Sequence, residues 1–245
     1  VTFPERDCSV QRRYQKVIEE SPAPNLSDDM RRSMRSAAGR LAASVNYRGA
    51  GTVEFIADAD SKQFYFLEMN TRIQVEHPVT EMVTGADLVA LQLQLAAGAD
   101  LSASLLEAPV ARGHAIEARV YAESPERGFL PSPGRLQCVA LPKPASDLRI
   151  DTGVRTGDDI TPHYDPMIAK IVAWGADRGA ALDRLGRALV ETRVEGVRTN
   201  LQFLSAVIDR PAFRAGGVTT GFIEAHREEL IVSAATFGGR ITLSV

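Results

Sequence analysis

One short segment carries an unusual density of polar side chains that could act on a ligand. Residues 68–78 read Glu-Met-Asn-Thr-Arg-Ile-Gln-Val-Glu-His-Pro. Residues two apart on a β-strand point to the same face, so Glu68 and Asn70 should present their oxygens together. Scattered acids on a solvated sheet face are the alternative interpretation of the carboxylates alone. The dense polar run that follows them favours chemistry over a generic surface.

A second acid, Glu54, lies one hairpin length earlier in the apolar run Thr-Val-Glu-Phe-Ile at residues 52–56. If the two runs pair as antiparallel strands, Glu54 and Glu68 converge. Two carboxylates and an amide oxygen suit Mg²⁺, which prefers oxygen ligands and fills its shell with water and phosphate. The sequence therefore predicts a magnesium site on a β-hairpin, with Arg72 and Glu76 available for chemistry beside it.

Helical spacing of apolar residues and turn chemistry predict the elements that position these groups. In chain order they are a helix at 27–45 capped by Ser27, strands at 52–57 and 63–69 with a connection at 58–62, a mostly helical stretch at 81–98 broken near Gly85, a short helix at 102–109, strands at 114–122, 135–141, 148–152 and 167–174, helices at 177–192, 199–208 and 219–229, and weak strand character after 231. Residues 7–20 are polar and basic around one apolar pair, and neither a helix nor a strand is predicted there. Helices and strands in separate runs predict an α+β fold and disfavour a Rossmann fold.

Composition narrows the class of protein. The chain has 245 residues, 44% of them hydrophobic, and a net charge of -3, which is ordinary for a globular protein and gives no reason to expect nucleic acid or an anionic membrane as partner. No apolar run is long enough to span a bilayer. Cys8 and Cys138 lie far apart and are expected to be free thiols in a reducing compartment. Because no initiator methionine opens the chain, we expect it to be a piece of a longer protein.

The run at 68–81 closely resembles the signature of biotin carboxylases, the ATP-grasp subunits or domains of biotin-dependent carboxylases. Further segments resemble the same family in the same order, namely 6–16, 19–24, 47–55, 113–119, 129–134 and 163–170. The resemblance implies the C-terminal half of an ATP-grasp domain at 1–110, an antiparallel sheet with flanking helices. It continues into the biotin carboxylase C-terminal domain at 111–230 and a tail or linker at 231–245.

The activity that the resemblance implies is carboxylation of biotin with bicarbonate and ATP, through carboxyphosphate. Carried over position by position, it assigns the metal to Glu54, Glu68 and Asn70; bicarbonate to Lys16, Arg72, Gln74 and the backbone of Val75; the general base to Glu76, with Arg72 and Arg119 also catalytic; ATP contacts to Gln11, Tyr14, Glu54 and Glu68; and biotin to Arg119 and Asp165. Tyr14 stands where the family usually has a histidine near the ribose. His77, just before a proline, is interpreted as structural.

The residue types suit these roles. Bicarbonate is a weak nucleophile, so its attack on a phosphate needs a positioned base and cationic groups. Arg72 offers a planar fork to a planar anion, and Lys16 adds a point charge. A guanidinium at Arg119 would stabilise the biotin enolate as its charge develops. A plain salt bridge between Arg119 and Asp165 is the structural alternative, and both interpretations can hold together.

The implied cofactors are ATP, Mg²⁺ or Mn²⁺, and biotin carried on a separate domain or protein. The implied partners are a biotin carboxyl carrier, a carboxyltransferase subunit and a second copy of the chain, in the cytoplasm or, in a eukaryote, the mitochondrial matrix. The family's N-terminal domain, its glycine-rich lid and its Ala-Met-Lys-Met biotin site are expected outside this sequence, so the fragment should be inactive alone.

Two other functions stay open. The chain could be a non-catalytic assembly module that forms dimer contacts through strands around 135–152, including Arg149. It could also belong to another ATP-grasp carboxylate–amine ligase, such as half of a carbamoyl-phosphate synthetase. That enzyme shares the metal triad but has no reason for the segments around Arg119 and Asp165. The acyl substrate of the parent enzyme stays open, with a slight resemblance to the methylcrotonyl type at 7–13 and 218–223.

Overall fold

The computed structural model describes residues 1–58, 61–101 and 109–231. It mixes helices with antiparallel strands, so the predicted α+β class is confirmed. Contacts within the chain divide it into two compact units. The first contains Val1–Asp7 and Glu20–Ala115, and the second contains Cys8–Glu19 and Ile116–Val245. Each unit is described by itself.

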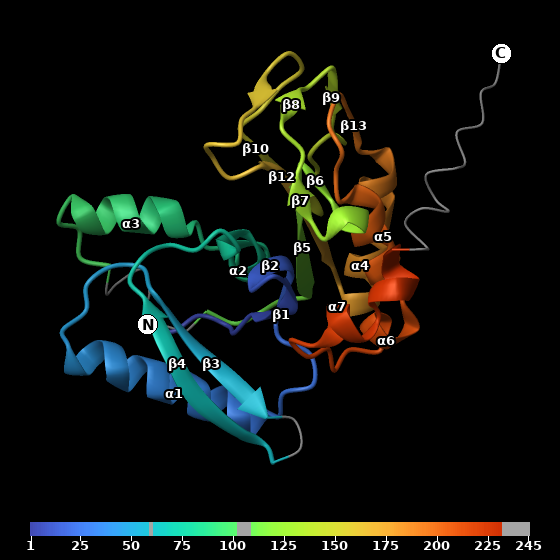
Figure 1. Ribbon diagram of the computed structural model, residues 1–245. Helices are drawn as coiled ribbons and strands as arrows, with labels where there is room; N and C mark the ends of the chain where they lie inside the picture. The colour runs from blue at the N-terminus through green and yellow to red at the C-terminus, as the bar shows by residue number, and fades with distance from the viewer. Residues whose placement is uncertain (59–60, 102–108, 232–245) are drawn as a thin grey trace. The chain divides into compact units, whose positions relative to one another are not determined.

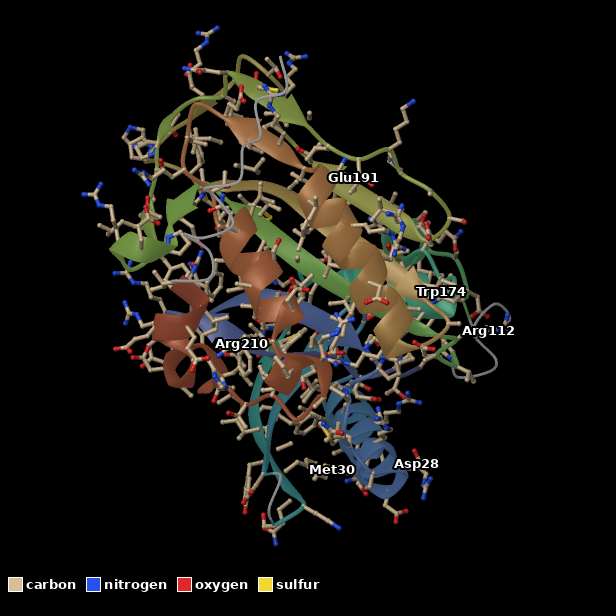
Figure 2. All side chains as sticks on the ribbon, turned by 90° about the vertical axis from the view of Figure 1, so that its right-hand side faces the viewer. Asp28, Met30, Arg112, Trp174, Glu191 and Arg210 are labelled. Carbon is tan, nitrogen blue, oxygen red and sulfur yellow. The ribbon has the colours of Figure 1, made fainter. Side chains whose placement is uncertain are left out.

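The first unit is built on a helix and a β-hairpin. Helix α1 (Asp28–Ser44) begins at Ser27, whose side chain accepts a hydrogen bond from the Met30 N–H at 3.2 Å. Two aspartates in its first turn interact favourably with the positive end of the helix dipole and so stabilise the helix. Met30, labelled in Figure 2, is the buried residue of this helix. The helix lies alongside the hairpin (Figure 1). The predicted helix and its cap are confirmed.

The hairpin consists of β3 (Thr52–Asp58) and β4 (Gln63–Asn70), paired antiparallel. Thr52 lies opposite Asn70 and Glu54 lies opposite Glu68, with a register shift directly after Glu54. The pairing predicted from the sequence is confirmed. Part of the predicted connection at 58–62 lies outside the described residues.

A loop and two helices follow the hairpin. Helix α2 (His77–Thr84) carries Pro78 at its start, where a missing N–H costs no helical bond. It ends at Gly85, whose φ of 74° is left-handed and whose N–H donates to the Glu81 carbonyl at 2.7 Å. Helix α3 (Leu88–Ala96) then starts at Asp87. The break near Gly85 is confirmed, but the helical stretch begins about one turn earlier than predicted. The predicted helix at 102–109 lies almost entirely outside the described residues.

The second unit is organised around a five-stranded sheet in the order β1-β2-β5-β12-β10, all but a few terminal residues of which belong to this unit. The strands are β1 (Asp7–Arg12), β2 (Gln15–Ser21), β5 (His114–Tyr121), β12 (Met167–Gly175) and β10 (Leu148–Thr152). The strands predicted at 114–122, 148–152 and 167–174 are confirmed. Strands β1 and β2 were not predicted, because their buried positions include the charged residues Arg12, Glu19 and Glu20.

Helices α4 (Arg178–Glu191) and α5 (Leu201–Asp209) close the core of this unit. Figure 2 shows α4 lying across the sheet, with Glu191 at its C-terminal end. Leu182, Leu185 and Leu189 of α4 join Ile116, Ala118 and Val120 of β5 in one buried cluster. Both helices match the predicted spans to within two residues.

Short elements complete the described part of the second unit. They are β6 (Glu123–Ser124), η1 (Pro125–Arg127), β7 (Leu130–Pro131), β8 (Gly134–Arg135), β9 (Cys138–Ala140), β11 (Asp159–Ile160), β13 (Arg193–Glu195), α6 (Pro211–Arg214) and α7 (Phe222–Ala225). The strand predicted at 135–141 is divided between β8 and β9. The helix predicted at 219–229 is interrupted at His226 and resumes at 227–231. The predicted tail after 231 lies outside the described residues.

Two findings bear on the protein's environment. Cys8 and Cys138 are both free thiols. Among the described helices, none has the length and apolar character to cross a bilayer.

Candidate active site

The three predicted metal ligands converge on the hairpin of the first unit. Glu54 and Glu68 face each other across β3 and β4. The Asn70 Nδ2 donates to the Glu54 Oε1 at 3.1 Å and to the Glu68 Oε1 at 2.8 Å. Glu68 is exposed and Glu54 is half-buried. The two carboxylates therefore lie within reach of one small ion at the surface of the hairpin.

The chemistry of this donor set fits Mg²⁺ or Mn²⁺. Both ions take carboxylate and amide oxygens and keep open positions for water and phosphate. Across the described residues, no three His, Cys, Asp or Glu side chains gather in the manner of a metal site. Here the third group beside the two carboxylates is the amide of Asn70. Its Oδ1 instead accepts a hydrogen bond from the Arg72 Nη2 at 3.4 Å. Coordination by this amide would require it to rotate so that Oδ1 faces the carboxylates.

Gln74 joins the acids to the interior of the first unit. Its side chain is 5% exposed, and its Nε2 donates to the Glu54 Oε1 at 2.6 Å. Its Oε1 accepts from the Arg6 Nη2 at 2.8 Å. Arg6 also donates to the hydroxyls of Thr52 and Thr80, both at 3.0 Å. One guanidinium thus links the start of the hairpin, the loop and helix α2.

Sequence reasoning assigned no role to Arg6. Its partners lie 46, 68 and 74 residues along the chain, so no local pattern marks it. The only available signal was its position in a segment that resembles the family. We regard Arg6 as the residue that holds Gln74, and through it Glu54, in place.

The loop between the hairpin and α2 carries the remaining predicted groups of this unit. Arg72 is exposed and its Nη1 donates to the Ile73 carbonyl at 3.1 Å. Glu76 is 2% exposed and immediately precedes α2. The His77 ring Nδ1 lies 2.9 Å from the Gln74 carbonyl, and its Nε2 lies 3.8 Å from the Glu81 carboxylate. His77 is thereby engaged in the loop's own structure.

The other predicted anion and nucleotide residues belong to the second unit, on the β1–β2 hairpin. Arg13 and Tyr14 form its turn with φ values of 51° and 62°, the left-handed backbone of a two-residue hairpin turn. Tyr14 is 99% exposed at the tip. The Gln11 Nε2 donates to the Cys8 carbonyl at 2.9 Å, and Lys16 is half-buried on β2.

Arg119 lies on the face of β5 opposite the apolar core. Alternate residues of this strand, Ile116, Ala118 and Val120, enter the core, which turns Arg119 to the other side. Arg119 is 7% exposed, and its Nη2 lies 2.5 Å from the Oε1 of the fully buried Glu19. Glu19 is a partner that sequence reasoning did not name.

Asp165 lies two residues before β12. It is exposed, and its Oδ1 accepts from the Met167 N–H at 2.9 Å. Burial raises the pKa of Tyr121, and the charge of Asp165 raises it further, whereas the Arg119 guanidinium lowers it through its charge and a hydrogen bond. Arg119 and Asp165 are thus brought to one tyrosine.

A second buried ion pair lies close by and was also missed. The Nε and Nη2 of Arg12 lie 3.0 and 2.5 Å from the two carboxylate oxygens of Glu123. The guanidinium carbon lies 4.8 Å from the centre of the Tyr121 ring and 5.8 Å from that of Phe129. Burial raises the pKa of Glu123, although the hydrogen bond and charge of Arg12 lower it. The two partners are 111 residues apart in sequence.

Comparisons with known proteins distinguish a biotin carboxylase from other ATP-grasp ligases. Residues 1–104 match the model of the carbamoyl-phosphate synthase L chain, ATP binding domain. That match alone would allow several ATP-grasp enzymes. Residues 117–225 match the biotin carboxylase C-terminal domain. The chain belongs to the biotin carboxylase family.

Similar biotin carboxylases and carboxylase subunits cover most of this chain. The mitochondrial methylcrotonoyl-CoA carboxylase subunit alpha of Rattus norvegicus is 52% identical over 95% of the chain and 32% of its own length. A biotin carboxylase of Nostoc is 49% identical over 90% of the chain and 48% of its own length.

A solved structure is similarly close. The biotin carboxylase domain dimer of Hydrogenobacter thermophilus 2-oxoglutarate carboxylase, in complex with MgADP, ADP and bicarbonate, has a TM-score of 0.87 and 40% identity. It is matched over 93% of this chain and 49% of its own. The chain therefore spans between about a third and a half of these relatives.

Proposed function

We propose that the protein takes part in ATP-dependent carboxylation of biotin, with bicarbonate as the carbon source and carboxyphosphate as the intermediate. The convergence of Glu54, Glu68 and Asn70 on one hairpin face, with Gln74 bonded to Glu54, supports a metal–nucleotide site. The observation that favours biotin over other substrates of ATP-grasp ligases is the match of residues 117–225 to the biotin carboxylase C-terminal domain. The solved relative from Hydrogenobacter thermophilus, whose complex contains MgADP and bicarbonate, supports the choice of ligands.

The nucleotide would lie along the β3–β4 hairpin. A divalent ion held by the acid–amide cluster would neutralise phosphate charge. Ile56 lies two residues beyond Glu54 and therefore on the same face, directly opposite Tyr65. Both side chains are 56% exposed. An exposed apolar and aromatic pair beyond the acids suits the flat base of a nucleotide, a feature that sequence reasoning missed. Gln11 and Tyr14 are proposed as further ATP contacts.

Bicarbonate would be bound by Arg72, Gln74 and the backbone of Val75, and Lys16 is proposed as a further bicarbonate ligand. Arg72 contacts Asn70, and Gln74 contacts Glu54, so both side chains lie next to the proposed metal ligands. Glu76 would accept the bicarbonate proton. Glu76 is buried, as expected of a base that is shielded from water. An acid with no role beyond the solvated surface would be exposed.

Biotin would be the ligand of Arg119 and Asp165. A guanidinium clamped by Glu19 stays fixed while charge develops on the biotin ureido oxygen. In the parent enzyme, we propose that the biotin comes on a carboxyl carrier and that a carboxyltransferase consumes the product. A cytoplasmic or mitochondrial matrix location is proposed, the rat relative being mitochondrial by name.

The dimer surface that we expected around Arg149 has support of its own. Strand β10 is an edge strand of the five-stranded sheet. On it, the Arg149 Nε donates to the Asp151 Oδ1 at 2.8 Å, and the Lys170 Nζ lies 3.1 Å from the Asp151 Oδ2. We propose that a second copy of the chain covers this strand. Arg149→Glu, which sets two acids side by side, should weaken the dimer in sedimentation experiments. An unchanged oligomeric state would exclude this surface.

The catalytic proposal is tested on the natural gene product that carries this chain. Biotin-dependent ATP hydrolysis and incorporation of labelled bicarbonate should both depend on Mg²⁺. Glu76→Gln should lower them by about 10²–10⁴-fold, the usual contribution of a general base. Glu81→Gln, in the helix that follows Glu76, is the matched control, because glutamine retains an oxygen for the Leu88 N–H that Glu81 binds at 2.6 Å. Full activity in Glu76→Gln would contradict the assignment.

We also propose that the 245-residue chain is inactive alone, because its relatives are two to three times as long. Biotin-dependent ATP hydrolysis by the isolated chain at the rate of the natural gene product would contradict this.

A further inference from the structure

Asn200 occupies a helix-capping position but does not cap its helix. It immediately precedes α5, and its carbonyl accepts the Leu204 N–H at 2.9 Å. An asparagine at this position normally turns its side chain back to the first free N–H groups of the helix. Here the side chain makes no such bond, and the residue is fully buried. The amide is used elsewhere.

The amide of Asn200 binds the backbone of the strand that carries Arg119. The Tyr121 N–H donates to the Asn200 Oδ1 at 2.8 Å. The Asn200 Nδ2 donates to the Arg119 carbonyl at 3.0 Å, and the Asn200 N–H donates to the Tyr121 carbonyl at 3.2 Å. Asn200 therefore pairs with β5 as a residue of a neighbouring strand would, at positions 119 and 121.

Arg119 is thereby fixed at both ends. Asn200 holds its backbone, and Glu19 holds its guanidinium at 2.5 Å. A buried guanidinium on a long side chain can be directed accurately only if the strand beneath it cannot slide or twist. Asn200 supplies that constraint from a residue 81 positions away.

We propose that Asn200 is a positioning residue for Arg119, acting through the backbone of β5. Treating Arg119 as the group that meets biotin rests on the proposed function, but the positioning itself does not. Asn200 has no need to touch any ligand. Its role is to set the direction from which the guanidinium is presented.

The test uses the ¹⁵N-labelled 245-residue chain and the NMR signal of the Arg119 Nε–H, identified by its loss in Arg119→Lys. Asn200→Ala should shift this signal and speed its hydrogen exchange several-fold, and should lower Tm by about 5–10 °C. Asn200→Asp keeps an acceptor for Tyr121 but sets a carboxylate oxygen against the Arg119 carbonyl in a fully buried position, so its effect should be at least as large as that of Asn200→Ala. Ser205→Ala is the matched control, because it removes a hydrogen bond within the same helix without involving β5.

A lower Tm with an unchanged Arg119 signal would show a merely structural role and overturn the proposal. If neither variant folds, the wild type decides. The proposal also requires slow exchange of the wild-type Tyr121 amide, and rapid exchange there would overturn it. Because no ATP, metal or biotin is present, failure here leaves the proposed function standing, and loss of the proposed function leaves this result unchanged.

Discussion

The β3–β4 hairpin of the first unit and the β5 region of the second unit both contain clustered charged residues, but the two clusters differ in burial and in pairing. On the hairpin, Glu68 is exposed, and Glu54 and Asn70 are half-buried at the surface. In the β5 region, Arg119 and Glu19 are buried and paired with each other. The hairpin leaves its acids accessible to solvent, where we propose that a cation binds. The β5 region supplies its own counter-ions.

This difference separates binding from stability. Surface acids keep their hydration, so removing one changes ligand affinity more than folding. Buried ions have lost their hydration, so removing one partner leaves an uncompensated charge in the interior. Substitutions in the two regions should therefore differ in which measurement they alter.

The largest effect is expected from breaking the Arg12–Glu123 pair. Glu123→Ala leaves Arg12 buried without its carboxylate and should lower the free energy of unfolding by about 3–5 kcal/mol. Urea denaturation measures the change. Glu126→Ala is the matched control, since Glu126 and its partner Arg198 are 43% and 68% exposed, and should cost at most about 1 kcal/mol. Equal losses from the two substitutions would remove the distinction between buried and exposed charge.

A smaller effect is expected from pH, with opposite signs at two carboxylates. Burial raises the pKa of Glu123, so its contribution to stability is present below pH 4.5 and is lost as pH rises through the folded-state pKa. Burial also acts to raise the pKa of Asp151, but Arg149 and Lys170 lower it below 3.8 overall. Its contribution is present above that pH and is lost as pH falls through the folded-state pKa.

Urea denaturation across both pH ranges tests these signs. Relative to the wild type, Glu123→Gln should remove the loss of stability on the alkaline side of pH 4.5, and Asp151→Asn should remove the loss on the acid side of pH 3.8. The same slope change in both variants would contradict the assignment of opposite shifts.

The smallest effect on folding is expected at the proposed metal ligands. Glu68→Gln should change the free energy of unfolding by no more than about 0.5 kcal/mol, because the side chain is exposed. A loss as large as that of Glu123→Ala would mean that the hairpin acids are structural after all.

Local chemistry in the sequence predicted the hairpin, α1 with its Ser27 cap, and the break at Gly85. Each depends on residues within a few positions of one another, such as an alternating apolar run or a left-handed glycine. The convergence of Glu54 and Glu68 followed from the hairpin register, because the two acids need only pair to lie opposite each other.

The buried ion pairs could not be predicted in this way. Charged residues usually mark exposed positions. The buried Glu19 therefore made β2 resemble a polar segment rather than a strand. Its partner Arg119 lies far along the chain. Arg6 and Asn200 likewise form their bonds across long sequence separations. Such contacts depend on tertiary packing, which one sequence does not display.

The central claim, that the β3–β4 hairpin is a divalent cation site, is tested most directly by Mn²⁺ titration of the ¹⁵N-labelled chain. Paramagnetic broadening detects even weak binding, and it should appear first at the amides of Glu54, Glu68 and Asn70. In Glu68→Gln, the Mn²⁺ concentration that gives the same broadening should be at least about tenfold higher than in the wild type. Asp58→Asn, on the same hairpin but with Asp58 bonded to Ser61, should behave as the wild type. Broadening that begins elsewhere, or that is unchanged in Glu68→Gln, would contradict the account.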